Sequence, residues 1–336
     1  MVVVAALGAV LLASMLLGIS LGTVTVPLGE IRRVIAAHLG LGDGEVSAVR
    51  DQIIWQYRTS RVLLAAVVGA ALAVSGACLQ VLARNGLADP YVLGVSSGAS
   101  LGAVLAIAFG VTAVGGLGAS GAAFVAAVLT LLVVFLLAQR AGRIGPSRLV
   151  LAGVATSYLA SALTSLVQLY ADPLALRGTM FWLLGSLQNA RWDDLGLPAA
   201  AIVVCTAWLL VRGRAMNVLA MGDEVAATLG VAVNRLRIEL LVIASLLTAT
   251  AVAVAGGIGF VGLMVPHAAR LVVGPDHRRV LPVCALAGAG FLVLVDLASR
   301  MLDRPNELPV GVFTAAIGAP FFLVLLRRAG RHAGTG

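Results

Sequence analysis

Apolar residues along this chain gather into ten long runs, separated by short connections that carry most of the charged side chains. About 20 apolar residues in a helix cross the hydrocarbon core of a bilayer, and most of the runs approach that length, the eighth being shorter. The pattern predicts an all-α polytopic membrane protein with about ten transmembrane helices in a single domain over residues 1–336. The runs lie near 2–22, 61–82, 90–110, 119–138, 149–170, 195–211, 236–255, 258–273, 280–302 and 310–326.

The composition agrees with a membrane domain. Of the 336 residues 60% are hydrophobic and 11% are charged, and the mean hydropathy is +1.05, whereas a soluble domain has about 25% charged residues. Cys78, Cys205 and Cys284 lie within apolar runs without CxxC spacing, so we expect small buried hydrophobic residues rather than metal ligands or a disulfide. Residues 2–22 lack a basic start and a clear cleavage site, which favours a first membrane helix over a signal peptide.

Arginine is distributed unequally between the two sets of connections. The connections after even-numbered runs, with the C-terminal tail, hold 14 arginines and five acidic residues, and the opposite set holds nine of each. Basic residues near membrane helices stay in the cytoplasm, so we expect both termini to be cytoplasmic. Runs two to five and seven to ten share a loose plan and are offset by an odd number of crossings, which predicts an inverted repeat, a common device of transporters.

Two stretches carry a recognisable pattern. Residues 256–279 read GGIGFVGLMVPHAARLVVGPDHRR, and residues 307–322 read ELPVGVFTAAIGAPFF. So much glycine destabilises a soluble helix but is tolerated in membrane helices, where small residues let backbones approach. From about Arg58 to Arg328 the chain resembles the permease family of bacterial ABC importers for iron-siderophores, haem and vitamin B12.

The resemblance implies the membrane-spanning permease subunit of an ATP-driven importer in the bacterial inner membrane. Its partners would be a second permease copy or paralogue, two ATPase subunits, a substrate-binding protein and membrane lipid, with no nucleic acid. Within the family, a ferric siderophore is the first expectation for the cargo, followed by haem and cobalamin. The chain has no lysine, and a nucleotide-binding P-loop requires one, so we expect no enzyme activity, no catalytic residues and no cofactor here, with ATP and Mg²⁺ on the partner ATPase.

The connection 212–234 contains a short segment with helix-end signals. Gly222 can end one helix, Asp223 and Glu224 suit the first turn of a new one, and Gly230 can end it. The local pattern fits equally an element that a soluble partner grips and an interfacial helix that covers the membrane edge. The resemblance implies a coupling helix that docks into the ATPase, and its matching residues are Gly222, Glu224, Ala226, Leu229 and Gly230.

Three arginines lie at the external ends of runs, against the cytoplasmic bias: Arg58, Arg61 and Arg300. They can snorkel to the interface, with Arg300 paired to Asp296 one helical turn earlier. The resemblance implies instead that they hold glutamates of the binding protein, and both roles are compatible for Arg300. Asp296 is the single carboxylate well inside a run; a structural pairing explains it better than a functional site.

The resemblance also places a cytoplasmic gate at Asn85, Leu87, Pro146 and Ser147, for which loop capping is the simpler explanation. The family commonly has Asn-Pro-Leu where this chain has Gly86 between Asn85 and Leu87, and glycine loosens that turn. His267 beside a proline is expected to pack rather than to bind metal. The alternative function, an ion-coupled secondary transporter, requires intramembrane carboxylates along a path, and one near the external edge argues against it. No nucleophile–base, paired-acid or zinc-ligand pattern suggests a membrane enzyme.

Overall fold

A computed structural model describes the chain except for residues 23, 42–46, 111–117, 141–142, 305 and 334–336. Each of the ten apolar runs corresponds to a helix, because a membrane-spanning segment satisfies its backbone hydrogen bonds internally. These helices are α1 (Val2–Ser20), α4 (Ser60–Leu82), α5 (Val95–Ala108), α6 (Gly118–Ala138), α7 (Pro146–Leu169), α9 (Gly196–Ala220), α11 (Val233–Ala255), α12 (Val261–Val273), α13 (His277–Met301) and α14 (Val310–Ala333).

Seven of these helices are long and apolar enough to cross a membrane by length and composition, and the apolar parts of α5, α12 and α14 are shorter. The shortness of α5 and α12 has a local cause, since a break precedes each helix. Gly94 adopts φ +76° before α5, and the backbone is irregular from Gly256 to Phe260 before α12. The predicted all-α fold with about ten apolar helices is therefore confirmed.

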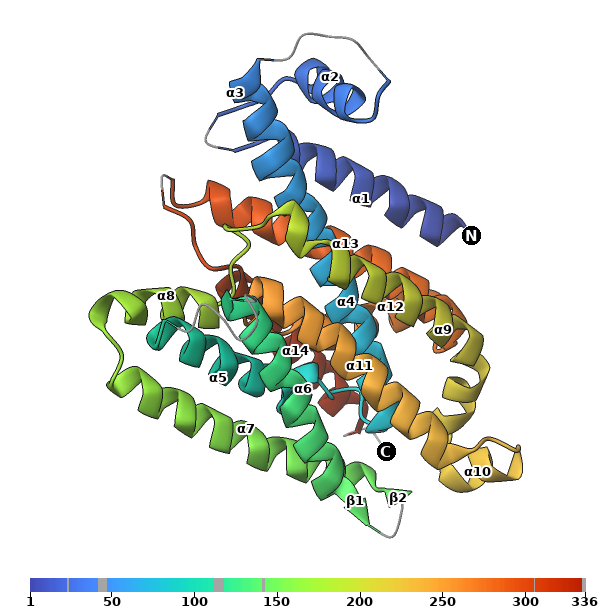
Figure 1. Cartoon of the computed structure of the whole chain (residues 1–336). Coiled ribbons are helices and arrows are strands. Elements are labelled where there is room, and N and C mark those ends of the chain that lie inside the picture. Colours follow the sequence, from blue (N-terminus) through green and yellow to red (C-terminus); the bar gives the residue numbers. More distant parts are fainter. Residues whose placement is uncertain (23, 42–46, 111–117, 141–142, 305, 334–336) are drawn as a thin grey trace.

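The connections contain further short elements that the apolar pattern did not predict. They are α2 (Leu28–His38), α3 (Ala48–Asp51), a π-helical segment (Gln52–Thr59), 3₁₀ turns at Pro90–Leu93 and Trp192–Asp194, α8 (Pro173–Leu183), α10 (Asp223–Thr228) and the antiparallel pair β1 (Gln139–Arg140) and β2 (Arg143–Ile144). Figure 1 places α2 and α3 at one end of the molecule and α10 with the β1–β2 hairpin at the other. We call these the outer end and the inner end, following the arginine distribution.

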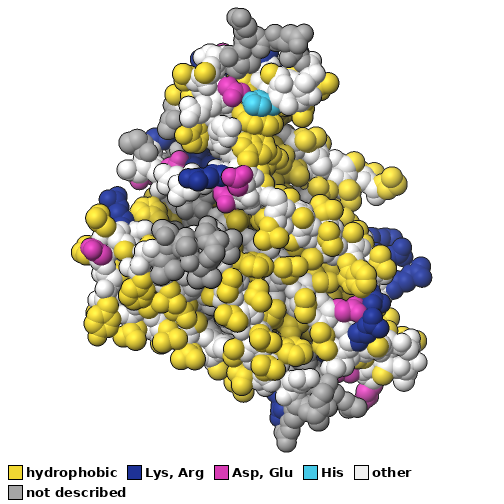
Figure 2. Space-filling view, in the orientation of Figure 1, with side chains coloured by type: hydrophobic (Ala, Val, Ile, Leu, Met, Phe, Trp, Pro, Cys, Tyr) yellow, Lys and Arg dark blue, Asp and Glu magenta, His cyan; other side chains and the backbone are white. Residues whose placement is uncertain are grey.

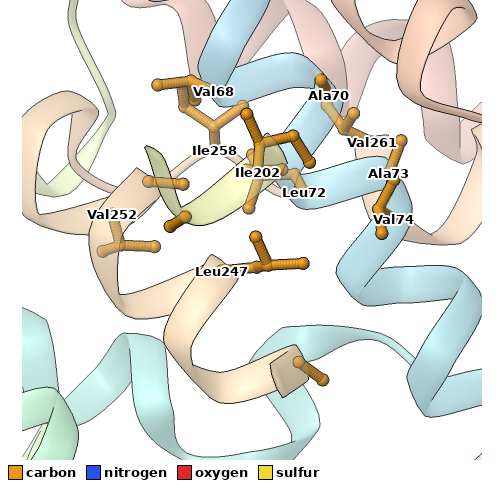
Figure 3. Close-up of a cluster of buried hydrophobic side chains, with 14 of the residues drawn as sticks. Val68, Ala70, Leu72, Ala73, Val74, Ile202, Leu247, Val252, Ile258 and Val261 are labelled. Carbon is orange, nitrogen blue, oxygen red and sulfur yellow. The ribbon is translucent and has the colours of Figure 1, made fainter. Parts of the chain in front are cut away.

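Helix α4 lies at the centre and is buried along almost its whole length. It packs on α9, α11, α12 and α13, and Figure 3 shows its aliphatic side chains facing Ile202, Val252 and Val261 of the surrounding helices. Two glycine pairs bring backbones into contact: a Cβ at Gly69 would fall on the carbonyl of Gly288 in α13, and one at Gly76 on the backbone of Gly262 in α12. Gly262 belongs to the glycine-rich stretch 256–279, so that stretch supplies one of the two backbones that meet at this crossing in the core.

The helices at the periphery present apolar side chains to their surroundings. Helices α1, α6 and α7 are mostly exposed, although α1 and α6 are the two most apolar of the candidate spans. Figure 2 shows hydrophobic side chains over the middle of the molecule and charged side chains gathered mainly towards its ends. This arrangement suits a lipid environment, because apolar side chains gain nothing from burial when their surroundings are hydrocarbon.

Candidate functional site

A buried ionic cluster at the outer end joins α4 to α13. The Arg61 Nη2 atom lies 2.9 Å from Asp296 Oδ1, and Arg61 Nη1 lies 2.8 Å from Glu307 Oε2. Arg300 Nη2 lies 3.1 Å from Asp296 Oδ2, one helical turn away on α13. Asp296 is completely buried, so its charge is tolerated because two guanidinium groups face it.

The third outer arginine, Arg58, is held by carbonyl groups. It donates hydrogen bonds to the carbonyl oxygens of Ile19 at 2.8 Å and Ser20 at 3.1 Å, and a third to that of Val24. These acceptors belong to the end of α1 and the segment after it. Arg58 therefore fastens α1 to the segment that leads into α4.

The three predicted arginines converge on one cavity. Arg58, Arg61 and Arg300 are each only 8% exposed, and they line a cavity of about 280 Å³ together with Gly22, Val24, Ile53, Tyr57, Gln188 and Glu307. The i,i+4 pairing of Arg300 with Asp296 is confirmed. Snorkelling to water does not describe these side chains, since they fold back onto the protein. Their docking role stays a prediction.

At the inner end, α10 is anchored through one carboxylate. Arg237 of α11 donates two hydrogen bonds to Asp223, at 2.7 and 2.9 Å. Arg84, just after α4, approaches the same carboxylate at 3.9 Å. Gly222 at φ +124° and Gly230 at φ +78° flank the helix in conformations that favour glycine. Asp223 thus holds α10 against α11 and near the end of α4.

The other predicted coupling residues divide into one that packs and two that face outwards. Ala226 is completely buried beneath α10, whereas Glu224 is exposed and Leu229 is 64% exposed. Met221 and Val225 add exposed apolar surface beside them. Because α10 is held against the protein by Asp223 and Ala226, its exposed apolar side chains form a patch that a soluble protein can cover. These positions fit the predicted coupling role, which stays a prediction.

The predicted gate residues lie on two inner connections. The Asn85 side chain accepts a hydrogen bond from Leu87 N at 2.9 Å, forming the turn that follows α4, and both residues are exposed. Pro146 begins α7, although its side chain is outside the described residues, and Ser147 next to it is exposed. The 3₁₀ turn Pro90–Leu93, which follows the first pair along the chain, packs on α7, the helix that the second pair begins. Their gating role stays a prediction.

A larger cavity of about 560 Å³ opens beside Arg84 and Asn85 at the inner end. Arg270 donates a hydrogen bond to Gln80 Oε1 across one wall, and Gln80 Nε2 donates to the Gly262 and Leu263 carbonyls at 3.3 Å. Gln80 thereby ties α4 to α12.

A polar bridge on another wall of this cavity connects α9 to the start of α13. Asn217 Nδ2 donates to Asp276 Oδ1 at 2.7 Å, and His277 N donates to Asn217 Oδ1 at 2.9 Å. The Asn217 amide and the Arg278 N–H lower the pKa of Asp276 by hydrogen bonding to its charged form.

His267, which the sequence singled out beside a proline, packs edge-on against Phe321, at 6.1 Å between ring centroids. Among the described residues no three His, Cys, Asp or Glu side chains gather to hold a metal ion.

Comparison with known proteins agrees with this architecture. The model of the FecCD transport family matches residues 10–328. The cobalamin import system permease protein BtuC of Halobacterium salinarum is 48% identical over 292 residues, covering 87% of this chain and 77% of that protein. The uncharacterized ABC transporter permease protein YvrB of Bacillus subtilis is 42% identical over 327 residues, covering 96% and 92%.

A solved structure extends the match to three dimensions. It is described as an inward-facing conformation of a metal-chelate type ABC transporter, and it superposes with a TM-score of 0.85 at 33% identity over 97% of this chain and 98% of its own. These comparisons give no support to an ion-coupled secondary transporter. The chain, with its helices built around α4 and its polar clusters at both ends, is a membrane permease that belongs to the FecCD transport family.

Proposed function

We propose that this chain is the membrane-spanning subunit of an ATP-driven importer for a metal chelate. The observation that carries the proposal is the geometry of α10. Its exposed face bears Val225 and Leu229, while Asp223 and Ala226 fix its other face to the protein. A short helix that is fixed to the permease and exposes an apolar patch gives an ATPase subunit a surface to bind, through which a movement of the ATPase can be transmitted to the permease. Transport would involve two permease chains, two ATPase subunits and a binding protein at the outer end.

For the cargo we propose a corrinoid ahead of a ferric siderophore or haem. The relative in Halobacterium salinarum and one in Vibrio cholerae, at 48% and 40% identity, are named cobalamin and vitamin B12 permeases. This order differs from the expectation drawn from the sequence, which put a ferric siderophore first. The three cargoes are distinguished by uptake into proteoliposomes that hold the permease with its co-purified ATPase and binding protein. Cyanocobalamin uptake supports the order given; uptake of a ferric siderophore or haem alone reverses it.

The coupling role is tested by Leu229→Asp, which places a charge in the exposed patch. We expect loss of ATPase co-purification and of ATP-driven uptake, with normal membrane insertion. Leu39→Asp is a matched control, because Leu39 is 61% exposed at the outer end. Unchanged co-purification in the Leu229 variant would refute α10 as the docking element. Uptake that persists without ATP and stops with a protonophore would favour the ion-coupled alternative.

The docking role is tested by Arg58→Glu combined with Arg61→Glu. The arginines line a cavity at the outer end, and charges that attract a partner mainly set its association rate and are screened by salt where water reaches them. We expect weaker capture of the binding protein, with a shallower dependence on salt than in the parent. Because both arginines also hold the fold together, thermal unfolding of the variant has to be measured alongside. Capture with the parent's affinity and salt dependence would refute the docking role.

A further inference from the structure

Glu307 is the one described carboxylate that lines the outer cavity, alongside Arg58, Arg61 and Arg300. It accepts from Arg61 Nη1 through both oxygens, at 3.2 and 2.8 Å. Asp296, the other acidic member of the cluster, lies behind the arginines and is completely buried. Glu307 therefore meets Arg61 from the open side, where its side chain is 31% exposed.

The charges of the cluster do not balance. Three guanidinium groups line the cavity and two carboxylates pair with them, while Arg58 donates to carbonyl groups. The cavity keeps an excess of positive charge that an incoming carboxylate would neutralise. That carboxylate would meet Arg61 on the side that Glu307 already occupies, and two carboxylates at one site repel each other.

We propose that Glu307 is an internal competitor, which occupies Arg61 in the free permease and is displaced when a carboxylate of the binding protein docks. This inference rests on the docking role proposed above. Competition of this kind lowers the affinity for the partner by the free energy needed to break the internal contact. It would allow the binding protein to leave once its cargo has been delivered.

The backbone that follows Glu307 is connected to the starts of two helices. The residues after it are tied by backbone hydrogen bonds: Leu308 N donates to Ser299 O at 3.2 Å, and Val310 N donates to Gly185 O at 3.0 Å. Val310 begins α14, and Gly185 follows α8 and lies against Gly257 in the break before α12. A shift of the backbone that accompanies the displacement of Glu307 would therefore be passed to the starts of α12 and α14.

The test is Glu307→Gln in the complete permease–ATPase complex in nanodiscs, with the binding protein that co-purifies with the parent chain. Glutamine keeps the size and removes the negative charge. We expect capture of the binding protein to become about two- to fivefold tighter, measured by biolayer interferometry, as is typical of a partly exposed ion pair. Glu307→Asp keeps the charge on a shorter side chain and is expected to give a smaller gain.

The matched control is Glu30→Gln, since Glu30 is an outer-end carboxylate paired with Arg50 at 2.7 Å and lies outside the cavity lining. Its capture is expected to match the parent's. Equal gains in Glu30→Gln and Glu307→Gln would show that the effect comes from net charge alone and would overturn the proposal. Unchanged or weaker capture by a folded Glu307→Gln variant would also overturn it. Weaker capture by the Arg58→Glu, Arg61→Glu variant together with no gain in Glu307→Gln would refute the competitor while the docking role stands. If that double variant captures normally, the docking role itself fails.

Discussion

The two ends of the molecule use arginine in different ways. At the outer end the side chains of Arg61 and Asp296 are 9% and 1% exposed, whereas at the inner end those of Arg84 and Asp223 are both 41% exposed. Arg61 and Asp296 join α4 to α13, two helices that are far apart in the sequence, while the inner pair joins a connection to a six-residue helix. The outer cluster is therefore built to fix an arrangement, and the contact of Arg84 with Asp223 is weak enough to break and form again.

The energies expected for the two kinds of pair differ accordingly. Removing one partner of a buried ion pair costs about 3–5 kcal/mol, because the other charge is left buried without compensation. An exposed pair is worth about 0–1 kcal/mol, since water screens it and ordering two long side chains costs entropy. Four substitutions, taken from the largest expected effect to the smallest, test whether this contrast holds.

Asp296→Asn should have the largest effect. It leaves Arg300 without a carboxylate and Arg61 with Glu307 alone, so we expect a loss of about 3–5 kcal/mol in the free energy of unfolding. The three buried cysteines make a thiol-reactive fluorophore a suitable reporter of thermal unfolding in detergent. Asp51→Asn, at a partly exposed outer carboxylate paired with His38, is the control. Equal, small shifts in both variants would remove the contrast between the ends.

Arg237→Gln is the intermediate case, because its guanidinium is buried at the inner end. It loses the contact of one guanidinium nitrogen with both oxygens of Asp223, whose side chain is 41% exposed, and we expect this shared contact to contribute about 1.5–3 kcal/mol in total. We expect lower thermal stability and faster proteolysis within the connection 212–234. A loss as large as that of Asp296→Asn would mean that the inner end is as rigidly held as the outer end.

Asp276→Ala should have a smaller, pH-dependent effect. Asp276 caps α13 by accepting from Arg278 N, and loss of such a cap costs about 0.5–2 kcal/mol. The folded state lowers the pKa of Asp276, so its contribution is full above the unfolded pKa of about 3.9 and disappears as the pH falls through the folded value. The difference between parent and variant should stay constant near neutral pH and shrink below about pH 4, as thermal unfolding against pH would show. A difference that grows on acidification would contradict this assignment.

Arg84→Gln should change stability least. Its pairing distance is 3.9 Å and both partners are well exposed, so we expect a change within about 0.5 kcal/mol, smaller still at high salt. Coupling between ATP hydrolysis and uptake is the more sensitive measurement, because Arg84 adjoins the turn at Asn85. Arg235→Gln, at an exposed i,i+4 pair with Glu239, is the control. A stability loss above about 1.5 kcal/mol would place Arg84 with the outer arginines.

Local patterns in the sequence predicted those features that depend on neighbouring residues. The ten apolar helices follow from bilayer thickness and backbone hydrogen bonding. The Asp296–Arg300 pair follows from i,i+4 spacing. The boundaries of α10 follow from Gly222, Asp223 and Gly230, which end and start helices by backbone conformation and charge.

Features that depend on tertiary packing were not predictable in this way. Asp296 and Arg61 are 235 positions apart, and no periodicity connects them. Arg58 was expected to reach water or a partner, but the chain after α1 folds over it. Helix α8 was missed because it is too short to appear as a membrane-spanning run. Asp172 followed by Pro173 is a helix-start signal that could have revealed it.

The main-chain contact between Gly76 and Gly262 also restricts how this permease can change shape. With no side chain between α4 and α12 at that crossing, nothing there can switch rotamer or be compressed. The same holds where Gly69 meets Gly288. We therefore expect a change between inward and outward access to carry α4, α12 and α13 together, with the displacement absorbed at contacts between side chains of the peripheral helices α1, α6 and α7.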